Sequence, residues 1–418
     1  MKKAVVVGGG ITGIATALYL NKKNFNVSIF ESKDKIGGIL RDSQFNNEIF
    51  YSNCQYLNKN SKWMNLFFND TFKKEFFTFH QTYSSYTDIF DHITIDNDYA
   101  MPVSENKIDL SNYQNFKNIN NIDDRFSIYG SMHKKALLDF SSKYYDNLSK
   151  LHSSCIFHMQ LSRLYFKNLK DIQNLKKESK IIDELFGLPR TKLFNDKKQI
   201  ECSIPINGYN YFFDKLSDFL RKEGIKVFCN KTLKPVLDDP KKTSPLSLFS
   251  RKEKINADVI VWCSNPVPLI KVCNIGILDN PYTKYKSIFS RTINGSKIKN
   301  PHYIQVYSKN TNITRIYFYS TIDNSNKVTI EAIDKNIDFE KDLKFAENIL
   351  KKCNFDLDLK FENQFANQKR YVLYTNDDFI KFKKMDDFVK GKNIICGSWT
   401  NYARDEKINE IYNKIDQI

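Results

Sequence analysis

The N-terminal stretch MKKAVVVGGGITGIATALYL carries no charged side chain from Ala4 to Asn21. An uncharged run of this length could form a membrane span or, after two lysines, a signal peptide. The pattern inside the run indicates a different structure, because the β-branched residues Val5–Val7 suit a buried strand, whereas Ala17 and Leu20 follow at helical spacing. Glycines separate the two parts. The pattern therefore predicts a strand, a tight turn and a helix.

The glycines of this turn have the spacing G-x-G-x-x-G, which is typical of dinucleotide-binding proteins. The residues of the motif are Gly8, Gly10, Ile11, Thr12 and Gly13. In such a unit the glycines allow a sharp turn, a close approach of the backbone to a pyrophosphate, and tight packing of the helix on the strand. A second apolar strand at 27–30 leads to Glu31, where an acid can accept hydrogen bonds from a ribose hydroxyl. This segment thus predicts a nucleotide site.

The hydrophobic pattern predicts other architectures further along the chain. Residues 61–200 are rich in Phe, Tyr, Lys and Asn and contain helical stretches such as HKKALLDFSSKYYDNLSKLH, so we expect a helical cap. Short alternating runs between polar turns at 285–375 predict an antiparallel sheet, with a helix at FEKDLKFAENILKK. The segment 238–254 carries Pro, Ser and charge and is predicted to be a surface loop.

The length and the net charge of the chain limit the number of domains and the classes of ligand to be expected. A chain of 418 residues with 41% hydrophobic residues is expected to form two structural domains. Its 64 Lys and Arg against 48 Asp and Glu give a net charge of +16, which favours anionic ligands, membrane surfaces or nucleic acid. The lysines are scattered, however, which indicates a solvated basic surface. No nucleic-acid-binding module is recognisable, so we expect no nucleic-acid partner.

The eight cysteines show neither a C-x-x-C pair nor regular spacing. They are predicted to be reduced core residues, without a disulfide framework or a metal site. Once the N-terminal run is assigned to a nucleotide fold, no other long uncharged segment favours secretion or a transmembrane helix. We therefore expect a cytoplasmic protein.

Immediately after Glu31 the chain reads SKDKIGGILRD, in which Gly37, Gly38 and Arg41 form a double-glycine motif that ends in arginine. Here the sequence resembles the superfamily of flavin-containing amine oxidases and protoporphyrinogen oxidases, which includes UDP-galactopyranose mutase and the phytoene desaturases. Two glycines let the chain pass close to a cofactor, and a guanidinium can bind a phosphate or a neighbouring carboxylate. The resemblance implies FAD as the cofactor.

Later segments carry the same resemblance. IPINGYNYFFDKLSDFLRKEGIKVFCNKTLKPV is similar to a family segment in which a valine contacts adenine through its backbone, and Leu233 stands at that place. The strand after Ala257 and Asp258 also resembles a family element. In GKNIICGSWTNYARDEKINEIYNKI, Gly397 matches the closing motif, but Ser398 replaces the usual acid. The family's covalent-attachment motif is missing, which implies that FAD is held without a covalent bond.

The matching segments divide the chain. Residues 1–60, 200–275 and 385–418 are expected to form a Rossmann-like FAD-binding domain, so the fold class is α/β with a discontinuous nucleotide domain. Residues 61–199 and 276–384 are then expected to form an α+β substrate domain, made of the helical cap and the antiparallel sheet.

The resemblance also implies that the sheet of the substrate domain presents one face to the flavin ring. Alternation along RIYFYS puts Arg315, Tyr317 and Tyr319 on one face, and these three residues with Tyr374 are the candidate catalytic residues. A cation beside phenols could hold an anionic or sugar-like small molecule. The alternative is a solvated outer face. Cys54, where relatives run close under the flavin, is a further candidate.

Three functions are compatible with these residues. The first is an FAD-dependent oxidoreductase that takes hydride from a small-molecule substrate. The second is a redox-neutral enzyme that resembles UDP-galactopyranose mutase and acts on a nucleotide sugar. The third is a flavin-binding protein without catalysis. Peripheral contact between the aromatic-rich cap and a membrane is also compatible with the sequence.

Overall fold

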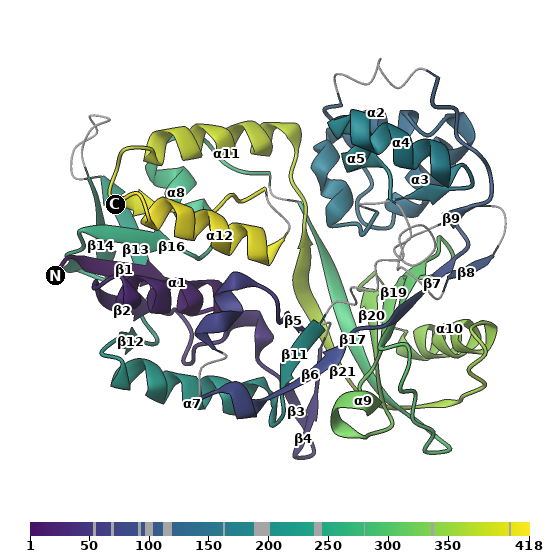
Figure 1. The fold of residues 1–418 in the computed structure, drawn as a ribbon, viewed down its shortest axis with the longest axis horizontal. Coiled ribbons are helices and arrows are strands. Elements are labelled where there is room, and N and C mark those ends of the chain that lie inside the picture. The colour runs from purple at the N-terminus through teal and green to yellow at the C-terminus, as the bar shows by residue number, and fades with distance from the viewer. Residues whose placement is uncertain are drawn as a thin grey trace.

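The computed structural model describes residues 1–52, 56–67, 71–90, 93–96, 103–111, 119–161, 164–187, 201–237, 245–279, 281–335, 338–400 and 403–418. Figure 1 shows two lobes side by side. One lobe carries both termini, and the other carries a large antiparallel sheet and a group of short helices. The long strands β17 (Tyr282–Thr292) and β21 (Leu359–Val372) begin or end where the lobes meet.

The first lobe is built on a five-stranded parallel sheet with the order β12-β2-β1-β16-β22. Its strands are β1 (Lys3–Val7), β2 (Asn26–Phe30), β12 (Lys226–Phe228), β16 (Val259–Trp262) and β22 (Ile394–Ile395). The central strands are apolar and buried, as parallel strands covered on both faces must be. The beginning, middle and end of the chain therefore meet in one sheet.

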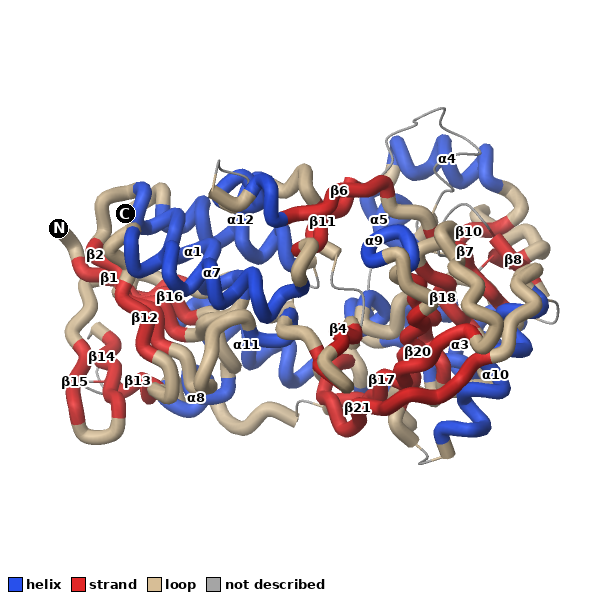
Figure 2. The backbone as a smooth tube through the Cα atoms, turned by 90° about the horizontal axis from the view of Figure 1, so that it is seen from below, coloured by secondary structure: helices blue, strands red, loops and turns tan. Residues whose placement is uncertain are grey.

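Helices cover both faces of this sheet (Figure 2). On one face, α1 (Ile11–Lys22), α7 (Gly208–Lys222) and α12 (Arg404–Ile415) pack with the buried side chain of Val6. On the other face, α8 (Val267–Val272) and α11 (Asn376–Val389) pack with Val5 and Val7. The alternation along β1 thus sends successive valines into two separate cores.

A three-stranded antiparallel sheet lies beside α8 and corrects one prediction. Its strands are β13 (Leu233–Leu237), β14 (Leu246–Ser250) and β15 (Glu253–Ile255). The prediction of a surface loop at 238–254 is wrong for residues 246–250 and 253–254. Leu246 and Leu248 are buried against the first lobe and pair with β13. Residues 238–244 lie outside the described part of the chain.

The second lobe contains a seven-stranded sheet with the order β21-β17-β20-β19-β18-β7-β8. The strands not yet located are β7 (Tyr83–Thr87), β8 (Thr94–Asp96), β18 (Tyr303–Tyr307), β19 (Ile313–Phe318) and β20 (Lys327–Ile333). The antiparallel sheet predicted from the alternating runs is confirmed, and so is the helix α10 (Phe339–Lys352), which packs on the sheet. The addition of β7, which pairs in parallel with β18, was not predicted.

Short helices form the cap of the second lobe, as expected from the helical stretches in residues 61–200. They are α2 (Ile122–Ser127), α3 (Ser131–Ser141), α4 (Leu169–Glu178) and α5 (Lys180–Leu185). Smaller strands complete the structure: β3 (Ser43–Phe45) with β4 (Glu48–Phe50), β9 (Val103–Ser104) with β10 (Tyr165–Phe166), and β5 (Leu57–Asn58) with β11 (Glu201–Pro205) and β6 (Phe76–His80). The predicted fold class, a Rossmann-like α/β unit with an antiparallel sheet and helical cap, is confirmed.

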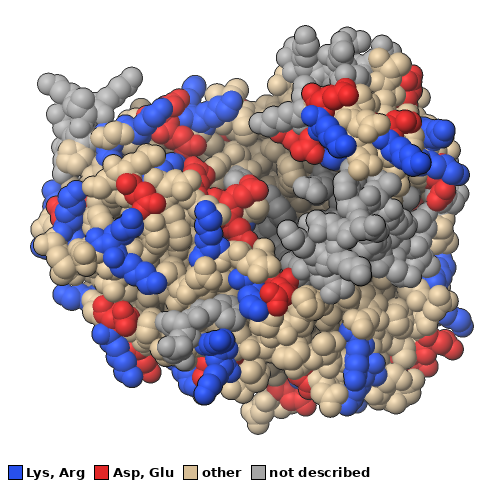
Figure 3. Space-filling view, viewed as in Figure 1, with Lys and Arg blue, Asp and Glu red and all other residues tan. Residues whose placement is uncertain are grey.

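The surface in Figure 3 shows Lys and Arg interspersed with Asp and Glu, in keeping with the predicted solvated basic surface. The same view shows a hollow between the lobes. Among the described residues, no helix is both long and apolar enough to cross a bilayer. In that same part of the chain, no cluster of acidic, His and Cys side chains has the arrangement of a metal site.

Candidate functional site

The turn between β1 and α1 has the geometry that its glycines predict. Gly8 adopts φ +107°, which favours glycine, and a Cβ on Gly13 would lie 1.9 Å from the carbonyl oxygen of Gly8. Gly13 therefore permits α1 to start directly against the turn. A Cβ on Gly10 would meet no atom within 4 Å, so the space in front of this residue is open. No side chain caps the N-terminus of α1 at Gly10, which leaves backbone N–H groups directed toward that space.

Glu31 lies at the end of β2 with its carboxylate turned toward this turn. Its Oε2 accepts a hydrogen bond from the Gly9 N–H at 2.7 Å, and its Oε1 accepts one from the Lys33 N–H at 2.8 Å. The residue is only 8% exposed. Since each carboxylate oxygen has two lone pairs, the anion retains acceptor capacity for a ligand hydroxyl.

The double-glycine segment lies directly against the first turn. The N–H of Gly37 donates to the carbonyl of Gly9 at 2.8 Å, and a Cβ on Gly38 would lie 3.2 Å from the Cα of Gly10. Gly37 has φ +117° and Gly38 has φ +61°, so both positions favour glycine. The two glycine segments thus form adjoining walls of one groove.

Arg41 connects the double-glycine segment to helix α7. Its Nε donates to the carbonyl of Ile36 at 2.6 Å, and its two terminal nitrogens lie 3.1 Å from Asn210 Oδ1 and from Asp214 Oδ1 on α7. Of the two partners expected for this guanidinium, a phosphate or a neighbouring carboxylate, the structure shows the carboxylate. Arg41 therefore ties the groove to helix α7.

Leu233 also lies next to the end of β2. The N–H of Lys231 donates to the backbone carbonyl of Glu31 at 2.9 Å, and Leu233 follows two residues later as the first residue of β13. Its side chain is buried. The chain at Leu233 is thus placed near Glu31, where the resemblance puts the adenine end of a dinucleotide.

The closing segment, which follows β22, packs against α12. A Cβ on Gly397 would lie 2.6 Å from Lys407 Cγ and 3.0 Å from the Lys407 carbonyl, so the glycine lets this strand end press against α12. The N–H of Ser398 donates to Glu410 Oε2 at 2.8 Å, and its hydroxyl lies 2.9 Å from that of Thr400. An acid is therefore present near this position, but it comes from α12 rather than from residue 398.

Arg315 is the centre of a polar cluster on β19. Its Nε lies 2.8 Å from Gln160 Oε1 and 2.8 Å from Gln305 Oε1, and its Nη1 donates to the Tyr317 hydroxyl at 3.0 Å. That hydroxyl also lies 3.2 Å from Glu331 Oε2. Arg315 and Tyr317 thus share one face of the strand, as alternation predicts.

Tyr319 follows the end of β19 and lies on the same side. Its ring centroid is 6.3 Å from that of Tyr317 and 4.6 Å from that of Tyr51. Tyr317 and Tyr319 are 0% and 1% exposed and pack with side chains of the nucleotide lobe, whereas Phe318 packs against α10. The alternative of a solvated outer face is therefore wrong.

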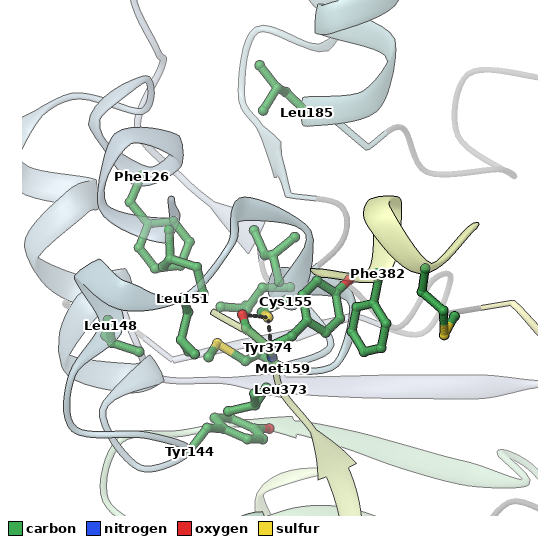
Figure 4. Close-up of a cluster of buried hydrophobic side chains, with 14 of the residues drawn as sticks. Phe126, Tyr144, Leu148, Leu151, Cys155, Met159, Leu185, Leu373, Tyr374 and Phe382 are labelled. Atoms are coloured by element: carbon green, nitrogen blue, oxygen red, sulfur yellow. Dashed lines mark hydrogen bonds between the residues drawn. The ribbon is translucent and has the colours of Figure 1, made fainter. Parts of the chain in front are cut away.

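Tyr374 lies apart from this cluster, between β21 and α11 (Figure 4). Its hydroxyl is 2.8 Å from Ser154 Oγ and donates to the carbonyl of Thr400 at 3.1 Å, so it connects the cap to the closing segment. Burial raises the pKa of this phenol. In Figure 4 the Cys155 thiol lies against the Tyr374 backbone, and burial raises the pKa of that thiol to about 12.

Sequence reasoning missed the partners of these residues. Gln160, Gln305 and Glu331 come from three separate segments, and none of them belongs to a motif. The bulge in the pairing of β19 with β20, between Ile313 and Arg315, was also not predictable. Cys54 lies outside the described residues.

Taken together, the parallel sheet, the glycine turn, the acid at the end of β2 and the double-glycine segment define a fold of the Rossmann type. Residues 6–71 match the family described as an NAD(P)-binding Rossmann-like domain. The whole chain has the fold of the FAD amine oxidase and protoporphyrinogen oxidase superfamily, as its motifs predicted.

Solved structures support this assignment of the fold. A reduced UDP-galactopyranose mutase has a TM-score of 0.66 at 12% identity, with 100% of this chain and 95% of that chain covered. A putative protoporphyrinogen oxidase from Exiguobacterium has a TM-score of 0.63 at 12% identity, with 100% and 98% covered. A putrescine oxidase bound to putrescine has a TM-score of 0.58 at 10% identity, with 100% and 98% covered.

Curated relatives match only a short stretch. A 1-hydroxycarotenoid 3,4-desaturase from a Flavobacterium species is 55% identical over 40 residues, which is 10% of this chain and 8% of the desaturase. A 4,4'-diapolycopen-4-al dehydrogenase from Metabacillus indicus is 50% identical over 38 residues, or 9% of this chain and 8% of the dehydrogenase. The matched stretch thus spans less than a tenth of each relative.

Proposed function

We propose that this chain binds FAD without a covalent bond and is an FAD-dependent oxidoreductase acting on a small molecule. The observation that carries the proposal is the groove formed by the glycine turn at Gly8–Gly13, the Glu31 carboxylate and the Gly37–Gly38 wall. The open space in front of Gly10 and the uncapped start of α1 suit a pyrophosphate.

Different residues of this chain would contact different parts of the cofactor. Glu31 would accept hydrogen bonds from a ribose hydroxyl, and the backbone near Leu233 would contact the adenine. Gly397 and Ser398 would lie beside the ribityl end. Cys396 is 2% exposed, and burial raises the pKa of its thiol to about 12, which suits a core residue better than a covalent attachment point.

We further propose that residues 1–60, 200–275 and 385–418 hold the cofactor, and that residues 61–199 and 276–384 supply the substrate site. When bound, FAD supplies hydride acceptance, which no amino-acid side chain can provide. The hollow between the lobes would then give a substrate access to the face of the sheet that carries Arg315.

Arg315, Tyr317, Tyr319 and Tyr374 are the proposed substrate-site residues. Arg315 would bind and orient an anionic or hydroxyl-rich substrate, because Gln160 and Gln305 fix the orientation of its guanidinium. Tyr317 and Tyr319 would exclude water with their rings, and the Tyr317 hydroxyl could donate or hold a proton beside Arg315.

The test is spectroscopic. The purified protein is expected to be yellow or to take up added FAD, and its absorbance near 450 nm should bleach when a substrate is added without oxygen, a general property of flavins. Amines, carotenoid-like alkenes and porphyrinogens are the substrates to compare. A colourless, folded protein that takes up NAD but not FAD would contradict the proposal.

A second candidate is a redox-neutral, mutase-like enzyme acting on a nucleotide sugar. The arginine and two tyrosines on one sheet face favour it, because such a surface suits a diphosphate and a sugar. In the same experiment, a UDP-sugar would be isomerised only after the flavin is first reduced, and no amine would bleach the flavin. If no ligand bleaches the flavin and no UDP-sugar is converted, the result would instead favour a non-catalytic flavin protein.

A further inference from the structure

Helices α1 and α12 lie side by side and run in the same direction. The Tyr412 hydroxyl donates to the carbonyl of Ala15 at 3.0 Å, and the Tyr19 hydroxyl donates to Asp416 at 2.7 Å. Both pairs are separated by 397 positions, so the two helices keep one register over this length. The same separation places the backbone of Lys407 level with Gly10 along the two helices.

The side chain of Lys407 lies at the carboxyl ends of the central strands. Its Cγ packs against Gly397, which follows β22, and its ammonium lies 5.6 Å from the ring centroid of Trp399. The Cys263 carbonyl lies 3.0 Å from where a Cβ of Gly8 would be, so Cys263 adjoins the turn. Burial raises the pKa of the Cys263 thiol, and the charge of Lys407 opposes this rise.

This is the place where the sheet order reverses. From β1 the chain continues to β2 on one side, whereas β16 lies on the other side. In open α/β sheets, ligands bind outside the carboxyl ends of the strands at this point. Lys407 lies at this end of the sheet, where its charge acts both on Cys263 after β16 and on His158 of the cap.

Among the described residues, no carboxylate forms an ion pair with Lys407, although the charge of Glu410, three residues further along α12, acts on it. Glu410, the nearest acid in its helix toward the C-terminus, already pairs with Lys414 at 2.8 Å and accepts the Ser398 N–H. Asp405 accepts a hydrogen bond from Trp63 Nε1 at 2.7 Å. Burial lowers the pKa of Lys407, and the charges of Cys263 and Glu410 offset only part of this shift. A bound anion would offset that penalty.

We propose that the Lys407 ammonium is a pyrophosphate-binding group that closes the dinucleotide groove from the side of α12. The proposal deepens, and rests on, the proposed binding of FAD. The glycine motif does not include this lysine, which lies in the final helix of the closing segment. The lysine would add a mobile charge opposite the backbone N–H groups of α1.

The test is isothermal titration of the flavin-stripped protein with FAD, ADP and riboflavin. Lys407→Met removes the charge and keeps the length of the side chain. Lys222→Met removes an exposed lysine at the end of α7 and is the control for net charge. Lys407→Met is expected to lower the affinities for FAD and for ADP by a similar factor, roughly ten- to a hundredfold for a charge-assisted contact. The affinity for riboflavin should not change.

The outcomes separate the two proposals. If the wild-type protein binds neither FAD nor ADP, the proposed function fails and this inference fails with it. If the wild-type protein binds both and Lys407→Met binds both as tightly or more tightly, the inference alone is wrong. A loss confined to FAD would place Lys407 at the flavin end and overturn it as well. Lys407→Arg, which keeps the charge, should retain most of the affinity if Lys407→Met folds poorly.

Discussion

The backbone N–H of Gly9 donates a hydrogen bond to Glu31 Oε2 at 2.7 Å, so one carboxylate joins the glycine turn to the end of strand β2. The other oxygen of the same carboxylate is held by the Lys33 N–H. Two backbone donors therefore fix the anion at the edge of the groove before any ligand is present. Such preorganisation reduces the cost of ordering a side chain when a ligand binds.

Glu31→Gln is expected to weaken FAD binding by roughly tenfold or more, because hydrogen bonds to a charged group contribute about 1.5–3 kcal/mol and each 1.4 kcal/mol is tenfold. The dissociation constant can be measured from the quenching of flavin fluorescence. Glu253→Gln, an exposed acid on β15, is the control. Equal affinities of Glu31→Gln and the control would show that the carboxylate does not touch the cofactor.

Gly13→Ala is expected to destabilise the fold. The added methyl would lie 1.9 Å from the Gly8 carbonyl oxygen, which forces the helix away from the turn. Overpacking of this kind costs about 1–3 kcal/mol or more, and the helix propensity gained by alanine recovers at most about 1 kcal/mol. Urea unfolding followed by circular dichroism measures the difference. An unchanged unfolding midpoint would mean that α1 does not pack as described.

Gly10→Ala should behave differently. Gly10 has φ −73°, which any residue adopts, and a Cβ there meets no protein atom within 4 Å. We therefore expect wild-type stability but an FAD affinity lowered by roughly tenfold or more, because the methyl projects into the space proposed for the pyrophosphate. Unfolding and flavin titration on the same sample give both values. Full affinity in Gly10→Ala would place the ligand elsewhere.

Arg315→Lys is expected to lower kcat/KM by roughly tenfold or more while flavin content stays at the wild-type level. A lysine cannot reproduce the planar set of donors that reaches Gln160, Gln305 and Tyr317 at once. Steady-state kinetics with a substrate identified by flavin bleaching, together with the flavin-to-protein ratio, checks this. Arg221→Lys, at an exposed position of α7, is the control. Unaltered turnover would move the substrate site away from β19.

Lys143 makes stability depend on pH. Burial lowers the pKa of this ammonium to about 7 from an ordinary value of 10.5, and its Nζ donates to the Ser308 carbonyl at 3.0 Å. Between about pH 7 and pH 10 the unfolded chain binds the proton and the folded chain does not, so the free energy of unfolding rises with pH in this window.

Lys143→Met should remove that rise, which amounts to at most about 1.4 kcal/mol per pH unit for one proton. Below pH 7 the variant should be more stable than the wild type by a constant amount, because the penalty of the buried charge is gone. Urea unfolding at several pH values measures both quantities. Lys150→Met, at an exposed position, should keep the wild-type dependence. A wild-type pH profile in Lys143→Met would contradict the assignment.

Local pattern was enough to predict the first β-α-β unit. Glycine spacing, three β-branched residues and an acid at the end of the second strand each have a local cause, and the structure places Gly8, Gly13 and Glu31 accordingly. Alternation likewise put Arg315 and Tyr317 on one face of β19, and their 3.0 Å contact agrees. In both cases neighbouring positions in the chain determine the result.

What the sequence did not predict depends on distant segments. Strand β7 joins β18 across more than half the chain, and nothing in YSSYT indicates that partner. Leu246 and Leu248 became strand β14 although Pro, Ser and charges surround them, because burial against the nucleotide lobe outweighs local propensity. The contact of Gln160 with Arg315 joins the cap to the sheet, and no spacing rule relates those two positions.

The assembly of the parallel sheet from both ends of the chain has a consequence for synthesis on the ribosome. Strand β1 is synthesised more than 250 residues before its neighbour β16 and more than 380 residues before the edge strand β22. Until α12 has emerged from the ribosome, the apolar face of α1 that packs against α12 stays exposed in the nascent chain. Variants that lack residues 404–415 should therefore depend more on chaperones and give a lower yield in the cell.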